Sequence, residues 1–272
     1  LRCMHTMEEK LAAFARLLKI MEELREKCPW DRKQTLDSLR HLTIEETYEL
    51  SEAILDNDLE EVQKETGDLL LHMVFYAQIA SEISADQGGW DIADSLNGIC
   101  DKLVDRHPHI YGDVEANDEE TVKANWEQLK LKEGKKSVLE GVPNGLPSLV
   151  KAYRMQDKVR GVGFDWDNEH QVWDKVEEEL AEFKAELDVD AERATDEFGD
   201  VLFALVNFAR FKDINPDEAL ERTNRRFRKR FQFMEHAIKH AGGKSLSEMT
   251  LAEMNVHWEA AKKALASDEK KA

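Results

Sequence analysis

Apolar residues recur three and four positions apart along most of this 272-residue chain, with charged residues between them. That period is typical of amphipathic α-helices, and helix breakers are scarce, with 13 glycines and 5 prolines. In the first half the pattern predicts helices over residues 8–25, 36–55, 59–83 and from 92 to just before Pro108, then a helix that carries Trp126. The sequence therefore predicts an all-α protein.

The second half repeats this order of elements. After a loop over 161–166, the pattern predicts helices over residues 172–187, 191–211, 216–240 and 247–266. Between the halves, residues 134–147 contain three glycines and two prolines, which predict a linker. We therefore expect tandem duplicated helical-bundle units, with a first unit over 7–133, a linker over 134–147 and a second unit over 148–266.

The net charge of −19 limits the classes of partner that the chain can bind. It opposes contact with a nucleic-acid backbone, so we expect no direct nucleic-acid binding. The longest apolar run, about 69–80, is too short and too interrupted to span a membrane, and the first ten residues lack the apolar core of a secretory signal. Three scattered cysteines predict no disulfide framework and favour the cytoplasm.

One acidic pattern occurs twice at nearly equal spacing. Residues 45–49 read EETYE and 65–68 read ETGD, while residues 178–182 read EELAE and 197–200 read EFGD. The two parts of the pattern are repeated at offsets of 133 and 132 residues. An isolated pair of acids on a helix is usually a solvated face, because 57 residues of the chain are Asp or Glu. A repeat at constant offset indicates instead a duplicated site.

The repeated acids extend apolar helix faces, so we expect them to converge inside each bundle. Clustered carboxylates repel one another and must be neutralised, and oxygen ligands without Cys or His favour Mg²⁺, with Mn²⁺ as a substitute. The predicted metal ligands are Glu46, Glu49, Glu65 and Asp68 in the first unit and Glu179, Glu182, Glu197 and Asp200 in the second.

Repeated cations and tryptophans could hold an anionic, aromatic substrate. Lys102, Arg106, Trp126 and Lys130 in the first unit are matched by Arg226, Arg230, Trp258 and Lys262 in the second. Cationic side chains suit phosphate oxygens and an indole can stack on a base, although a helical Trp is by default a packing residue. His107 and His109 lack counterparts, since Phe231 and Phe233 take their places, so we interpret them as structural.

These motifs, with CPWD at 28–31, DRHPHIYGD at 105–113 and GFDW at 163–166, resemble those of bacterial MazG. The resemblance implies Mg²⁺-dependent hydrolysis of ribo- and deoxyribonucleoside triphosphates to monophosphate and pyrophosphate, broad base tolerance and a homodimer. The resemblance also implies that the second unit is the catalytic one. Its four acids would hold the metal, and residues 175–179, beginning with Lys175, would line the nucleotide site. It also implies substrate contacts for Arg226, which stands where the family commonly has Lys, and for Arg230, Trp258 and Lys262.

Other readings remain open. Glu178 is a candidate to orient the attacking water. The first unit keeps its acids, and our hypothesis is that it binds metal or nucleotide weakly and mainly serves assembly. A di-metal redox bundle is disfavoured because the chain contains no Glu-x-x-His. The strongest alternative is a noncatalytic acidic helical scaffold that binds nucleotide or metal without turnover.

Overall fold

The described part of the chain is entirely helical apart from its turns. The computed structural model describes residues 5–112, 137–242 and 245–266, which contain ten α-helices, three short 3-10 helices and no strand. The chain divides into two compact units, Leu1–Glu115 and Ala116–Ala272. The predicted all-α class is confirmed. No helix in the described ranges is long and apolar enough to cross a membrane.

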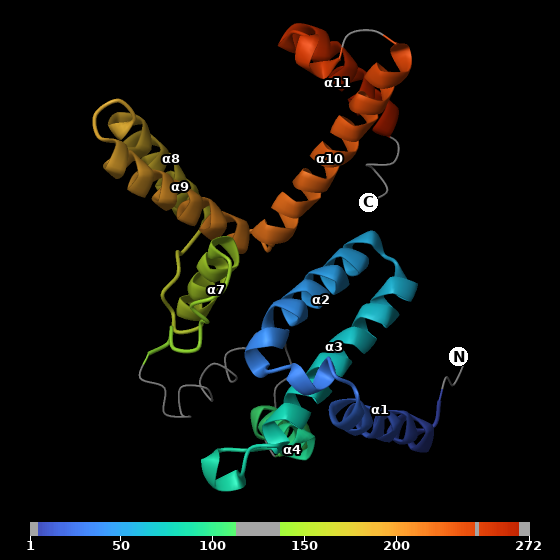
Figure 1. Cartoon of the computed structure of the whole chain (residues 1–272). Helices are drawn as coiled ribbons and strands as arrows, with labels where there is room; N and C mark the ends of the chain where they lie inside the picture. Colours follow the sequence, from blue (N-terminus) through green and yellow to red (C-terminus); the bar gives the residue numbers. More distant parts are fainter. Residues whose placement is uncertain (1–4, 113–136, 243–244, 267–272) are drawn as a thin grey trace. The chain divides into compact units, whose positions relative to one another are not determined.

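The first unit is built around an antiparallel hairpin of α2 (Leu36–Asp56) and α3 (Leu59–Ser81), against which α1 (Met7–Lys27) packs. α4 (Ile92–Arg106) and the single turn α5 (Pro108–Tyr111) follow. Short 3-10 turns cover Asp31–Lys33 and Ala85–Gln87. The core lies where the three long helices meet, and its buried members are Met21, Leu39, Val74, Phe75 and Ile79. Figure 1 shows the hairpin in blue and cyan, with its two helices side by side.

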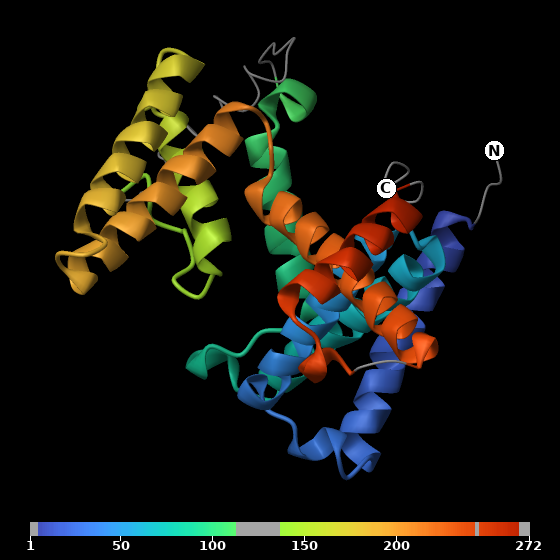
Figure 2. The same cartoon turned by 90° about the horizontal axis from the view of Figure 1, so that it is seen from above.

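The second unit repeats the hairpin with α8 (Glu169–Glu186) and α9 (Ala191–Phe211). α7 (Ser148–Arg160) packs on α9, and α10 (Pro216–Ala241) packs with α11 (Leu251–Leu265) after a 3-10 turn at Leu246–Glu248. Figure 2 shows α7 in yellow-green, α8 in yellow and α9 in orange lying together. Two aromatic pairs join the hairpin helices, Trp173 with Phe208 and Phe183 with Phe198, at centroid separations of 4.9 and 5.3 Å. Such pairs contribute about 0.5–1.5 kcal/mol each beyond burial.

Local capping chemistry sets the ends of both hairpins. The residue that follows α2 and caps it, Asn57, has the left-handed conformation, φ 55°, which asparagine tolerates better than most residues. The next residue, Asp58, accepts hydrogen bonds from the backbone amides of Glu60 and Glu61 and so begins α3. In the second unit Asp190 caps α9 in the same way. The caps hold the paired helices in register and thereby bring the acidic motifs opposite one another.

Two elements of the second unit differ from the sequence prediction. No helix was predicted over 148–160, where α7 lies, because the residues that α7 buries include Gln156 and Lys158 rather than apolar side chains. The last predicted helix, 247–266, begins in the structure at Leu251, because Thr250 caps it in a capping box with Glu253. The region of the fifth predicted helix, which carries Trp126, lies outside the described residues.

Candidate functional site

Three carboxylates of the second unit converge between α8 and α9. Oxygen atoms of Glu179, Glu197 and Asp200 all lie within 4.8 Å of one another, and Glu179 is 7% exposed. The EExxE motif supplies the first residue and the ExGD motif the other two. The fourth predicted ligand, Glu182, lies outside this group, but its negative charge raises the pKa of Glu197. The structure therefore brings together three of the four acids directly and places the fourth nearby.

The mutual repulsion of these acids is visible in the electrostatics of Glu197. Loss of hydration raises the pKa of its carboxyl above the ordinary value, and the negative charges of Glu182, Asp200 and Glu179 raise it further. A carboxylate in this position is stabilised when a cation joins the cluster. The site thus has the electrostatic character of a cation site.

One lysine partly neutralises the cluster. Lys175, one turn before Glu179 on α8, places its Nζ 2.6 Å from Glu179 Oε1 and 2.8 Å from Glu178 Oε1. Both carboxylates hold the pKa of this lysine above its ordinary value, with the hydrogen bond to Glu178 as the largest cause. Lys175 therefore remains charged at neutral pH, beside the acids and open to solvent over about a third of its side chain.

A pocket adjoins the cluster within the second unit. Its volume is about 570 Å³, and Lys175, Glu179 and Asp200 are among its lining residues. Most of its remaining wall is apolar, from side chains of α7, α9 and the GFDW loop: Met155, Val159, Phe164, Trp166, Phe203 and Ala204. A pocket of this size and lining is typical of small-molecule sites. One end is therefore anionic with a fixed cation, and the rest can enclose an apolar or aromatic group.

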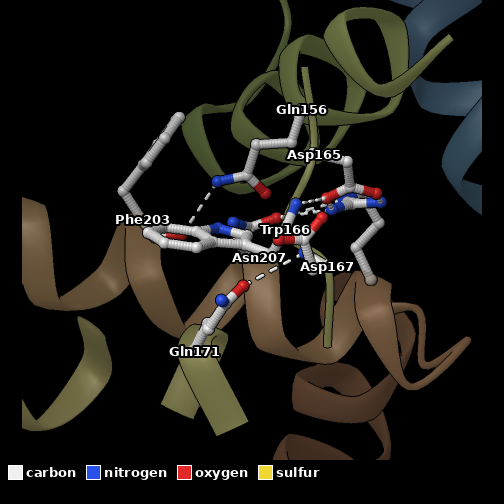
Figure 3. Close-up of polar contacts among 8 residues, drawn as sticks. Gln156, Asp165, Trp166, Asp167, Gln171, Phe203 and Asn207 are labelled. Atoms are coloured by element: carbon white, nitrogen blue, oxygen red, sulfur yellow. Dashed lines mark hydrogen bonds and ion pairs between the residues drawn. The ribbon is translucent and has the colours of Figure 1, made fainter. Parts of the chain in front are cut away.

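A buried ion pair organises the loop side of the pocket. Arg210 on α9, 3% exposed, forms a bidentate pair with Asp165, with one N–O distance of 3.0 Å, and also donates to Asn207 Oδ1 at 2.9 Å. The pair ties the GFDW loop to α9. Figure 3 shows Asp165 and Trp166 of this loop close to Asn207 of α9. Arg210, Asn207 and Asp165 all line the pocket. These residues were not among the predicted site residues.

Gln156 was also missed from the sequence. It reaches from α7 to donate through Nε2 to the backbone oxygen of Phe203 at 2.8 Å, as Figure 3 shows. Its Oε1 atom is buried and accepts no hydrogen bond within the described residues. A buried glutamine within an unpredicted helix gives no sequence signal of a site. Asp165 and Trp166, in contrast, belong to the GFDW motif that carried the resemblance.

The first unit holds a related cluster made of a different triad. Oxygen atoms of Glu46, Glu49 and Glu65 lie within 4.8 Å of one another. The negative charge of Asp68, the fourth predicted ligand, raises the pKa of Glu46. Loss of hydration and a hydrogen bond with Glu65 raise the pKa of Glu46 above its ordinary value. Glu65 is 1% exposed, and its pKa is lowered chiefly by the hydrogen bond from Lys64, whose Nζ lies 3.0 Å from Oε1. In each unit, three of the four predicted acids therefore lie together.

The neutralising lysine comes from opposite helices in the two units. Lys64 lies on α3 beside the ExGD motif, and the residue 132 positions later is Asp196. Lys175 lies on α8 beside the EExxE motif, and the residue 133 positions earlier is Leu42, which packs against the core of the first unit. The first unit therefore has no cation where Lys175 lines the pocket of the second.

The predicted substrate cations lie on other helices. Arg226 and Arg230 are on α10, and Trp258 and Lys262 are on α11, where Trp258 contacts Phe227 at a centroid distance of 5.2 Å. None of these four lines the pocket beside the carboxylates. Lys102 and Arg106 lie on α4 of the first unit, and Trp126 and Lys130 lie outside the described residues.

Comparisons with known proteins identify the family of the chain. A model of the MazG nucleotide pyrophosphohydrolase domain matches residues 34–111. The chain is 41% identical over 261 residues to the nucleoside triphosphate pyrophosphohydrolase/pyrophosphatase MazG of Thermotoga maritima, covering 94% of this chain and 98% of that protein. It is 39% identical over 258 residues to the nucleoside triphosphate pyrophosphohydrolase of Escherichia coli K12, covering 91% and 96%. It is 44% identical over 269 residues to the uncharacterized protein YabN of Bacillus subtilis, covering 94% of this chain and 53% of that protein. Because the identity extends over almost the full length of the first two relatives, the chain belongs to the MazG family.

Proposed function

We propose that the second unit hydrolyses nucleoside triphosphates to nucleoside monophosphate and pyrophosphate, with Mg²⁺ held between α8 and α9. The observation that carries this proposal is the meeting of three carboxylates and a lysine at one end of a largely apolar pocket of about 570 Å³. The two relatives described above are named as nucleoside triphosphate pyrophosphohydrolases, which supports the same reaction.

The residues present fit a hard divalent cation. All donors in the cluster are carboxylate oxygens, and the raised pKa of Glu197 reflects negative charge that a cation would relieve. Glu179, Glu197 and Asp200 would hold Mg²⁺ or Mn²⁺, with Glu182 beside them. When bound, the metal would neutralise the triphosphate and acidify a water for attack on phosphorus.

The chain's own residues would bind and orient the substrate. Lys175 is already charged and placed between Glu178 and Glu179, so its ammonium can donate to phosphate oxygens at the metal end. Phe164, Trp166 and Phe203 can enclose the nucleoside and exclude water. Because stacking on aromatic rings tolerates any base, such walls support broad base tolerance. Acceptance of both ribose and deoxyribose is proposed from the family resemblance.

Glu178 is proposed to orient the attacking water. Its side chain is exposed over 56% of its area, and its Oε1 accepts the hydrogen bond from Lys175. A carboxylate held by a lysine at the rim of the cluster is placed to accept a proton from water. The role is tested separately by the Glu178→Gln variant below.

A homodimer is proposed to complete the site. Arg226, Arg230, Trp258 and Lys262 would contact substrate by family resemblance, yet they do not line the pocket. An apolar stripe on α9, formed by Phe198, Leu202 and Leu205, remains 40–48% exposed. A stripe of this kind is typical of an interface, and association of two copies could bring α10 and α11 to a neighbouring pocket.

The first unit is proposed to bind a cation or nucleotide weakly and to serve assembly. Its triad can hold a cation, but Leu42 stands where the second unit has Lys175. Without that ammonium, phosphate would meet an acidic cluster at which Lys64 is already engaged by Glu61 and Glu65. The net charge of −19 further supports a function without direct nucleic-acid binding. The cytoplasmic location remains a prediction.

The experiment is pyrophosphate release from a panel of ribo- and deoxyribonucleoside triphosphates, with and without Mg²⁺. The matched variants are Glu182→Ala and Glu49→Ala, which occupy equivalent places in the two units. Mg²⁺-dependent release that only Glu182→Ala abolishes supports the proposal. Equal loss in both variants would contradict the division between the units. Nucleotide binding without any release would favour the noncatalytic scaffold.

A further inference from the structure

Two histidines near the end of α10 form a second kind of candidate metal-binding group, separate in sequence from both carboxylate clusters. His236 and His240 are four residues apart near the end of this helix, and both side chains are exposed. Their Nε2 atoms are 2.9 Å apart, and their ring centroids are 4.1 Å apart at an interplanar angle of 54°. The rings are therefore tilted, with their outer nitrogens converging on one point at the surface.

This separation matches chelation of one ion by both rings. With metal–imidazole bonds of about 2.0–2.1 Å, two nitrogens are about 2.9 Å apart at the right angle of tetragonal Ni²⁺ or Cu²⁺ and about 3.3 Å apart at tetrahedral Zn²⁺. Histidines at i and i+4 on one helix face are an established geometry for a metal pair. Two neutral rings can instead share a single hydrogen bond, which is the alternative that the experiment must separate.

The surroundings favour a cation. The pair lies in the last turns of α10, where the helix carbonyls carry partial negative charge, and of the charged residues next to it in sequence Glu235 is acidic and Lys239 is basic. The chain as a whole has a net charge of −19. Imidazole nitrogens select borderline ions such as Zn²⁺, Ni²⁺ and Cu²⁺ over Mg²⁺, which prefers oxygen. Within the described ranges, the groups of three or more candidate ligands are the two carboxylate clusters, so this pair would offer two ligands and leave the other positions open.

We propose that His236 and His240 form a transition-metal site on α10 that is separate from the carboxylate clusters and takes Zn²⁺, Ni²⁺ or Cu²⁺. The bound ion cross-links two successive turns at the end of α10. Its remaining coordination positions are open to water or to an external ligand. Since the helix also bears Arg226 and Arg230, the ion fixes the end of a helix that the proposed function uses, but its binding does not depend on that function.

The test is calorimetric titration of the full chain with Ni²⁺ and with Zn²⁺ in a large excess of Mg²⁺, which masks the carboxylate clusters. The variants are His236→Ala and His240→Ala, with His41→Ala, an exposed histidine on α2, as the matched control. We expect one ion per chain to bind at this site in the wild type and in His41→Ala. Removal of either ligand should weaken that binding at least about tenfold, because even loss of an outer-sphere partner costs about 10- to 100-fold.

A second readout identifies the ligands. The electron paramagnetic resonance spectrum of the Cu²⁺ complex should show two coordinated imidazole nitrogens in the wild type and fewer in each single variant. The Ni²⁺-loaded wild type should also unfold at a higher temperature than the metal-free protein, a gain that His236→Ala loses. Equal stoichiometry and affinity in the wild type and His236→Ala would overturn the proposal and leave the pair as a hydrogen bond only.

Discussion

Replacing Lys175 by Met tests the proposed phosphate contact directly. The substitution keeps an unbranched side chain that is one atom shorter and removes the ammonium that lies 2.6 Å from Glu179 and 2.8 Å from Glu178. A hydrogen bond to a charged group contributes about 1.5–3 kcal/mol when it is formed in a shielded site. If that contact forms with the triphosphate, kcat/KM for pyrophosphate release should fall roughly 10- to 100-fold, at about 1.4 kcal/mol per tenfold change.

The same change should have little effect on folding. The lysine side chain is 36% exposed, so its ion pairs are screened by solvent and contribute at most about 1 kcal/mol to stability. Thermal unfolding of Lys175→Met should therefore remain close to that of the wild type while turnover falls. This separation of activity from stability distinguishes substrate contact from a structural role.

The matched control is Lys64→Met in the first unit. Lys64 forms the equivalent ion pair, 3.0 Å from Glu65, but from the other helix of its hairpin. We expect kcat/KM to stay within about twofold of the wild type, since a twofold change corresponds to less than about 0.5 kcal/mol. Unchanged turnover in Lys175→Met, or an equal loss in Lys64→Met, would refute the assignment of substrate binding to the second unit.

Three further predictions concern the same unit. Glu178→Gln should lower kcat with little change in KM if the carboxylate accepts a proton from water; steady-state kinetics that match the wild type would remove it from the reaction. Glu197→Gln should abolish Mg²⁺-dependent turnover yet make the metal-free protein more stable at neutral pH, because a group with a raised folded pKa disfavours folding above its unfolded pKa. Differential scanning calorimetry should show that this gain shrinks as pH falls toward the ordinary pKa of Glu, and a gain independent of pH would contradict the cause. Asp165→Ala should cost about 3–5 kcal/mol, because it leaves the buried guanidinium of Arg210 unpaired; chemical denaturation with a loss below about 1 kcal/mol would show that the ion pair is not structural.

Helical period and capping residues explain why the hairpins could be predicted closely. The structure ends α2 at Asp56, one residue beyond the predicted end, because Asn57 and Asp58 encode the turn locally. α7 could not be found in this way, since its buried residues are the polar Gln156 and Lys158, and Gln156 finds its partner, the backbone oxygen of Phe203, on α9. Tertiary burial of polar groups therefore hid one helix of the pocket.

The acidic clusters show a similar limit. Equal spacing in the two motifs predicted four equivalent ligands in each unit, but the converging atoms belong to Glu46, Glu49 and Glu65 in one unit and to Glu179, Glu197 and Asp200 in the other. Side-chain rotamers and the neighbouring lysine decide which oxygens meet, and spacing does not encode either. The pocket beside the second cluster also depends on a loop and on α7, which the repeat pattern does not describe.

Because the two neutralising lysines lie on opposite helices of their hairpins, one helix of a hairpin cannot be replaced by its counterpart from the other unit without changing the charge balance of the cluster. A chimera that carried the EExxE helix of the second unit into the first would put two ammonium groups, from Lys175 and Lys64, around one cluster. The reciprocal exchange would pair Leu42 with Asp196 and leave the acids of the second unit with no adjacent lysine from either motif helix. Since the repulsion between these carboxylates would then lack a neighbouring ammonium, a bound metal ion should stabilise the second chimera more than it stabilises the natural unit. The two copies can thus be exchanged as whole hairpins but not helix by helix.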